Sequence, residues 1–316
     1  MINEVRNTVL SILNKNNYGY ISPSDFNLYA MNAQMEVYKQ YYSDYNKIIN
    51  AENARVSGTD YADIESPLAE TLESFLVDNY LANIAGNIFS VPTLTTVGNE
   101  AYYILKVLCF TELITSGQIT SAASNQLNDS SATFITDGIS AGYIVTNVDT
   151  GTVSTVLSVT SQTSILLSSN IFPANGADYK IFSNTSKEAE KVSVGKIGML
   201  NSSNLTQPNN SFPAYTLEGQ NIKVYPNTID TAGQVQAVYF RFPKVPKWTY
   251  ITLANGEPVF DQSQSDYQDF ELPQEELYVL VTKILQYCGV SIRETEVAQF
   301  AIAQEAAQEA TFSPKQ

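Results

Sequence analysis

Apolar residues recur at helical spacing in the first third of the chain and again near its C-terminal end. The first run ends at the turn formers Asn16-Asn17-Tyr18-Gly19. A second helix is predicted to begin at Pro23, because Ser22 can cap it and proline has the backbone angle of a first helical turn. This helix is expected to reach the mid-fifties. A third helical piece begins near Ser66, with one apolar face formed by Leu68, Leu72, Phe75 and Leu76.

The C-terminal region carries the clearest helical pattern. Pro273 opens a helix with acidic residues in its first turn, and Gly289 is predicted to close it. A capping box at Ser291-Ile292-Arg293-Glu294 starts a last helix that includes Phe300. Beyond Ala303 the sequence is rich in Gln, Glu and Ala, and this tail either docks on a neighbour or stays exposed as solvated helix.

The middle of the chain has the pattern of short strands. Residues 116–131 form a Ser/Thr/Asn-rich link, and the segment 132–183 alternates strands with turn formers. The predicted strands lie near 132–136, 143–147, 153–159, 164–167 and 179–182. Short strands at this spacing are typical of a small antiparallel sandwich or barrel. Further on, residues 188–200 are predicted to be helical. Two more strands follow, at 222–225 and 235–242, and the second ends where Pro243 cannot donate to a sheet.

Together these elements predict an α+β fold, in which N- and C-terminal helices pack with a small β region and a small all-β module is inserted. The domain limits follow from the pattern. We expect an N-terminal helical part with the first strands of a core domain at 1–131, the inserted module at 132–183, the β-containing remainder of the core domain at 184–271, and a C-terminal helix pair and tail at 272–316.

Composition argues against an enzyme. The chain has no histidine, which removes the usual general base and the commonest zinc ligand. No phosphate loop, dinucleotide-binding glycine pattern or hydrolase motif is present in the sequence. Cys109 and Cys288 lie in apolar sequence and are expected to be buried thiols. We therefore predict no catalytic residue, no cofactor and no metal ion.

Acidic residues give the chain a formal net charge of −15. This charge can keep the chain soluble, or it can line a channel wall past which DNA moves without binding. Composition does not distinguish these two roles. Pairs such as Asp60 with Asp63, or Glu70 with Glu73, could serve glycoside hydrolysis, but 32 acids produce close pairs by chance. The aspartates at 137, 149 and 178 lack the regular spacing of a calcium loop, so we interpret them as turn formers.

Twenty tyrosines are the more unusual feature of the composition. Tyrosine suits surfaces that are apolar on one side and wet on the other. Spacings of three and four place four phenols on one stripe of the second helix, and core packing is the alternative for part of their ring area. Four phenols are hard to satisfy in a dry core. The candidate subunit interface therefore consists of Tyr38, Tyr41, Tyr42 and Tyr45, with Phe300 of the last helix.

Several stretches resemble a known class of proteins. Val192-Ser193-Val194-Gly195-Lys196, Ser211-Phe212-Pro213-Ala214-Tyr215, Ile222-Lys223-Val224-Tyr225-Pro226 and the run from Tyr239 to Trp248 resemble virion connector proteins of crAss-like phages. The closing region, 272–310, is similar to the end of the adaptor or gatekeeper (tail tubular) proteins of short-tailed phages. The segment 134–182 resembles small β modules of phage structural proteins.

The resemblance implies a virion structural protein, made in the host cytoplasm, that forms a ring of about twelve copies in the head-to-tail connector. Its partners would be other copies of itself, the portal protein and neighbouring connector or tail proteins. DNA would pass through the ring without sequence-specific binding, and the ring would offer a platform for tail attachment. The inserted module and the length of the N-terminal helices depart from the compact gatekeeper pattern.

Three other functions remain open on the sequence, and one of them is a structural protein of the host cell. A tail or baseplate adhesin would bind a host glycan through its β module, with Tyr143 and Tyr179 as the candidate aromatic platforms. A carboxylate glycosidase would need two carboxyl groups that face each other across a groove. No run approaches about 18 consecutive apolar residues, so the sequence does not predict a membrane span. Residues 1–6 lack the pattern of a secretion signal.

Overall fold

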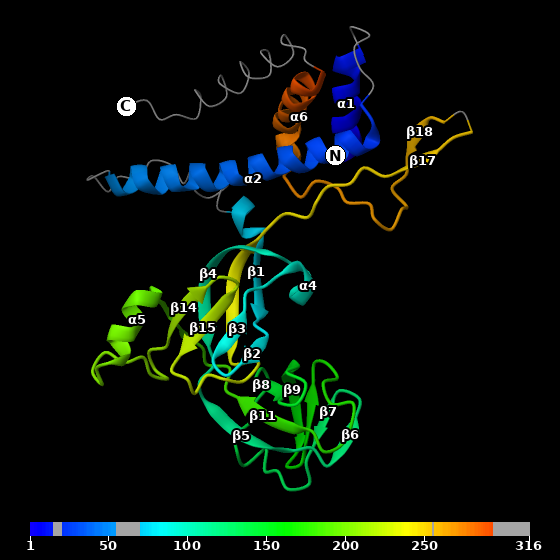
Figure 1. Cartoon of the computed structure of the whole chain (residues 1–316). Helices are drawn as coiled ribbons and strands as arrows, with labels where there is room; N and C mark the ends of the chain where they lie inside the picture. Colours follow the sequence, from blue (N-terminus) through cyan, green and yellow to red (C-terminus); the bar gives the residue numbers. More distant parts are fainter. Residues whose placement is uncertain (15–20, 55–69, 255, 293–316) are drawn as a thin grey trace. The chain divides into compact units, whose positions relative to one another are not determined.

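The computed structural model describes residues 1–14, 21–54, 70–254 and 256–292. The chain divides into two compact units (Figure 1). One comprises residues 1–75 and 243–316, and the other residues 76–242. We treat each unit by itself and call them the helical unit and the β unit.

Three helices form the frame of the helical unit: α1 (Ile2–Asn14), α2 (Pro23–Ala54) and α6 (Leu277–Ile292), the last preceded by the short helix η1 (Gln274–Glu276). Helix α6 packs against both α1 and α2. The predicted cap of α2 is confirmed, because the amide of Asp25 donates to the hydroxyl of Ser22 at 3.1 Å. The faces that meet are apolar, and they bury Val5, Val9, Phe26, Ala30, Ala33, Val37, Leu280, Ile284 and Cys288.

The extended segment that leads into α6 is bound to α2 by side-chain amides. Asn27 accepts from the amide of Trp248 at 2.8 Å and donates to the carbonyl of the same residue at 3.2 Å. Gln34 donates to the carbonyl of Lys244 at 2.7 Å and accepts from the amide of Glu271 at 3.1 Å. These amides satisfy main-chain groups that would otherwise need a neighbouring strand. The segment also carries the hairpin of β17 (Tyr250–Thr252) and β18 (Pro258–Phe260).

Two sheets of the β unit pack face to face as a sandwich. The four-stranded sheet has the order β1-β16-β4-β12 and the five-stranded sheet the order β13-β14-β15-β3-β2. All pairs are antiparallel except β13 with β14. The strands are β1 (Leu76–Tyr80), β2 (Asn83–Ala85), β3 (Ile88–Ser90), β4 (Ala101–Cys109), β12 (Lys187–Glu188), β13 (Glu190–Lys191), β14 (Ala214–Glu218), β15 (Asn221–Tyr225) and β16 (Val235–Arg241).

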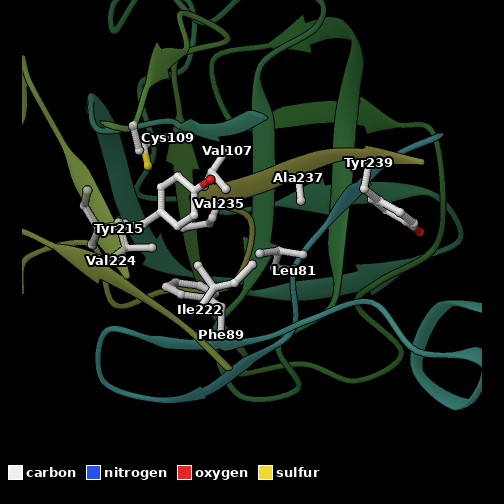
Figure 2. Close-up of a cluster of buried hydrophobic side chains, with 12 residues drawn as sticks. Leu81, Phe89, Val107, Cys109, Tyr215, Ile222, Val224, Val235, Ala237 and Tyr239 are labelled. Atoms are coloured by element: carbon white, nitrogen blue, oxygen red, sulfur yellow. The ribbon is translucent and has the colours of Figure 1, made fainter. Parts of the chain in front are cut away.

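Inward-facing side chains of both sheets fill the sandwich core (Figure 2). Ala237 and Tyr239 of β16 alternate with outward residues, as the period of a strand requires, and they belong to the same buried cluster as Phe89 and Ile222 of the other sheet. Two short helices lie outside this core, α4 (Leu94–Val97) and α5 (Val194–Asn201). Helix α5 packs through Ile197 against Ala214 of β14.

A seven-stranded sheet in the order β5-β11-β8-β9-β10-β7-β6 forms the second part of the β unit. Its two outermost strands are consecutive in the chain, with β5 ending at Gln118 and β6 beginning at Ser121. The edges of the sheet therefore meet, and the sheet curls into a barrel around its own apolar core. Its strands are β5 (Leu113–Gln118), β6 (Ser121–Ala123), β7 (Gln126–Asn128), β8 (Ile144–Asn147), β9 (Val153–Ser161), β10 (Ser164–Leu167) and β11 (Asp178–Phe182).

The predicted fold class is wrong. The described residues form a β-rich structure with four sheets, whereas the sequence predicted an α+β fold with terminal helices and only a small β region. Residues 116–131, predicted as a link, contribute β6 and β7 and complete the barrel. Residues 188–200, predicted as a helix, contain β13 and helix only from Val194. Strands of two or three residues are too short to show a period in the sequence.

Three smaller predictions are also corrected. Residues 134–138 form turns and residues 132–133 have no regular structure, so the barrel strand expected at 132–136 is absent. Leu76 begins β1 and does not continue a helical face with Leu72 and Phe75. Helix α6 continues through Gly289 to Ile292. Gly289 therefore lies inside the helix and is buried there, although helices disfavour glycine.

Candidate interaction surfaces

Metal-ligand clusters and thiols are the two kinds of reactive group considered first in the described part of the chain. No group of three or more Cys, Asp or Glu side chains there could hold a metal ion. Cys109 and Cys288 are free and buried, and burial raises the pKa of each thiol to about 12. Both thiols are therefore protonated at neutral pH, and a protonated thiol is a poor nucleophile.

The acidic residues singled out in the sequence serve local structure where the structure describes them. Asp149 accepts from the amide of Asp178 at 3.1 Å, and Asp137 accepts from the hydroxyl of Thr133 at 3.0 Å. These contacts fix turns of the barrel. Glu70 and Glu73 are exposed on one turn of helix. The pair Asp60 and Asp63 lies outside the described residues.

The tyrosine stripe of α2 is partly internal to the helical unit. Tyr38 is fully buried and makes edge-to-face contacts with Phe75 and Tyr42, at centroid distances of 5.0 and 5.6 Å. Tyr41 and Tyr45 are half-buried. Burial raises the pKa of Tyr41, and Glu276, which accepts a hydrogen bond from the phenol, raises it further together with Glu275. Tyr38 therefore belongs to the core, while Tyr41, Tyr42 and Tyr45 keep some exposed area.

Three candidate residues remain: Phe300 of the proposed interface, and Tyr179 and Tyr143 of the glycan-binding alternative. Phe300 lies outside the described residues. Tyr179, proposed as a glycan platform, is buried inside the barrel, where its hydroxyl donates to Asp129 at 2.8 Å. A buried ring cannot stack on a sugar, so this half of the adhesin interpretation is wrong. Tyr143 is half-buried against the same core.

The strongest exposed apolar feature was not singled out in the sequence. Helix α5 and the loop after it, residues 194–212, form what we call the protrusion. Its side chains at Leu205, Phe212 and Met199 are 94, 77 and 76% exposed. These three are the most exposed large apolar side chains among the described residues, and exposed apolar side chains gathered in one segment often mark an interaction site. The signal available in the sequence was a run of Asn and Ser with isolated Met, Leu and Phe and no acidic residue.

Hydrogen bonds hold the protrusion in a defined conformation. The side-chain oxygen of Asn209 accepts from the amides of Ser211 and Phe212 at 2.9 and 3.0 Å. The next residue, Asn210, accepts through its carbonyl from Thr111 at 3.0 Å and through its side chain from Thr228 at 3.1 Å. The exposed side chains are therefore presented by a fixed loop, which lowers the entropy cost of binding.

The hairpin β17–β18 is a second exposed apolar feature, in the helical unit. On one face Tyr250 and Phe260 stack on Trp248, at centroid distances of 5.6 and 5.9 Å. Ile251 and Val259 pair across the opposite face and are both exposed. A hairpin with only one face covered is suited to contact a further surface.

Comparison with known proteins assigns this chain to no family. No protein-family model matches the chain, and no curated protein matches its sequence significantly. Among the described residues, no helix has the length and apolar character needed to cross a membrane.

Proposed function

We propose that this chain is a virion structural protein that forms a ring in the head-to-tail connector of a tailed phage. The observation that carries the proposal is the protrusion, which presents large apolar side chains on an ordered loop. Full burial of one such side chain is worth about 1.5–3 kcal/mol, so leaving three of them exposed in a functional state is costly. A partner that covers the protrusion removes this cost.

The resemblance of residues 192–248 to connector proteins supports the same proposal, because the protrusion lies within those residues. A ring of about twelve copies arises when one contact between two different surfaces repeats and closes. The net charge of −15 suits a channel through which DNA moves without sequence-specific binding. The exposed hairpin offers a separate surface for the portal protein or a neighbouring connector or tail protein.

Native mass spectrometry of the chain, mixed with the portal protein of the same virion, tests this function. We expect a complex with a fixed ratio of the two proteins. A chain that stays separate from the portal and from every other connector protein of the virion contradicts the proposal. A chain that instead binds a cell-surface glycan supports the adhesin.

A further inference from the structure

The sandwich has two sides at which the edge strands of both sheets lie, and the strand orders identify them. On one side β1 and β2 are the edge strands of the two sheets, and only Leu81 and Ala82 separate them. On the other side β12 and β13 are the edge strands, separated by Ala189. The chain therefore passes from sheet to sheet at both sides, and the sides lie at opposite ends of each strand order.

Exposed apolar residues occur on both sides. The protrusion follows β13 directly and packs on β14, so it belongs to the β12/β13 side. On the β1/β2 side, Ile84 of β2 is 56% exposed, and Leu94 of α4 is 68% exposed. Figure 1 shows α5 and α4 on opposite sides of the sandwich. We call residues 83–99, which include Ile84 and Leu94, the receiving edge.

Charge distinguishes these two surfaces from the chain as a whole. The protrusion contains no acidic residue and one basic residue, Lys196. The receiving edge contains no charged residue, and the acidic residue that follows it is Glu100. Two copies of a chain with a net charge of −15 repel each other, and a contact through surfaces without acids minimises that repulsion. A second copy of this chain is therefore the partner that the two surfaces fit.

We infer that the protrusion of one copy docks on the receiving edge of the next copy, head to tail. This inference rests on the proposed function and specifies the contact that repeats around the ring. Leu205 and Phe212 would cover Ile84 and Leu94. The edge strand β2 has only one neighbour in the described sheet, so its outer main-chain groups face the docking copy. Because the two surfaces differ, each copy binds one neighbour on each side.

A pair of charge variants tests the inference. Leu205→Asp places a carboxylate on the protrusion, and Ile84→Asp places one on the receiving edge. Both positions are exposed in the single chain, so both variants should keep the wild-type circular dichroism spectrum and unfolding midpoint. Leu157→Asp is the matched control, because Leu157 is an exposed apolar residue of the barrel outside both surfaces. Native mass spectrometry and analytical ultracentrifugation give the size of each species.

We expect each interface variant alone to lose all species above the monomer, while the control assembles like the wild type. An equal mixture of the two variants should form a one-to-one dimer that grows no further. The Ile84→Asp copy still has its protrusion, and the Leu205→Asp copy still has its receiving edge. Only a contact between two different surfaces gives this result.

Three results overturn the inference. These are assembly of either variant like the wild type, a mixture that remains monomeric, and a control that loses assembly as well. In each of these cases the wild-type chain still assembles, so the proposed ring would form through a different contact. A wild-type chain that stays monomeric alone and with the portal protein contradicts the proposed function and the inference together.

Discussion

Thr146 of the barrel donates a hydrogen bond of 2.7 Å to the main-chain carbonyl of Ala232 in the sandwich, and both residues are buried. Beside it Lys180 donates to Thr231 at 2.9 Å. Phe110, Ile144 and Phe182 form an apolar cluster at the same junction. These contacts join the barrel to the sandwich, so the β unit contains both as one compact unit.

Thr146→Val should lower the free energy of unfolding by about 1–3 kcal/mol, because the buried carbonyl of Ala232 loses its donor while the side-chain volume is kept. Urea denaturation of the variant measures this change. Thr146→Ser keeps the hydroxyl and should lose less. A Thr146→Val protein as stable as the wild type would show that this hydrogen bond contributes nothing to the junction.

Gly117 lies against the buried pair of Tyr179 and Asp129. A methyl group at residue 117 would lie 2.7 Å from the Tyr179 hydroxyl and 2.8 Å from a carboxylate oxygen of Asp129. Gly117→Ala should therefore destabilise the protein by about 1–3 kcal/mol. Thermal or urea unfolding measures the effect.

A second variant isolates the cause of that loss. Adding Tyr179→Phe removes the hydroxyl that the methyl group meets, so the double variant should be more stable than the sum of the two single changes predicts. The control is Gly198→Ala on α5, where the added carbon meets no atom within 4 Å apart from its own chain neighbours and the backbone of the helix. Strictly additive effects would contradict the proposed clash.

Asp269 gives the helical unit a dependence on pH. Its carboxylate accepts from the amides of Ile2 and Phe270 at 2.7 and 2.8 Å and pairs with the amino group of Met1 at 3.0 Å. Burial raises its pKa, but these interactions outweigh burial and hold the pKa below its ordinary value. A lowered pKa in the folded state stabilises the protein above the unfolded-state pKa, which is about 3.9, and this contribution is lost as the pH falls through the folded-state value.

Asp269→Asn should therefore destabilise the protein at neutral pH and have a smaller effect near pH 3. Urea unfolding of both proteins across this range of pH gives the comparison. An effect of the same size at every pH would show that the charge of Asp269 is not involved.

The two thiols should resist modification in the folded protein. Cys109 and Cys288 are buried, and burial raises the pKa of each to about 12. At pH 8 a disulfide reagent should therefore react with neither thiol in the native protein and with both in denaturant. Rapid reaction of one thiol in the native state would mean that its surroundings open.

The long helices could be predicted from the sequence because packing and local signals agree there. Ser22 and Pro23 mark the start of α2 and the structure begins the helix at Pro23, while the apolar stripe from Leu280 to Cys288 identifies α6. Strands β9, β10 and β11 also lie where the alternation and turn residues place them. In these segments local preference and tertiary contact favour the same structure.

The remaining parts depend on contacts between distant residues. Strand β13 has two residues and exists because it pairs with Ala214 and Tyr215 of β14. The core position of Tyr38 depends on Phe75, which lies in another segment of the helical unit. The exposure of Leu205 depends on how Asn209 and Asn210 fix the loop. The hydrophobic pattern indicates the period of a segment, but it does not indicate which distant residues pack against that segment.

The mass of the purified wild-type chain, measured by native mass spectrometry over a range of concentration, tests the central claim most directly. A head-to-tail contact that closes on itself predicts one dominant oligomer, whose mass is a fixed whole multiple of the 34.8 kDa chain and does not grow with concentration. Addition of the portal protein should favour the same closed species. A chain that remains monomeric at every concentration, alone and with the portal, would contradict a ring-forming connector protein.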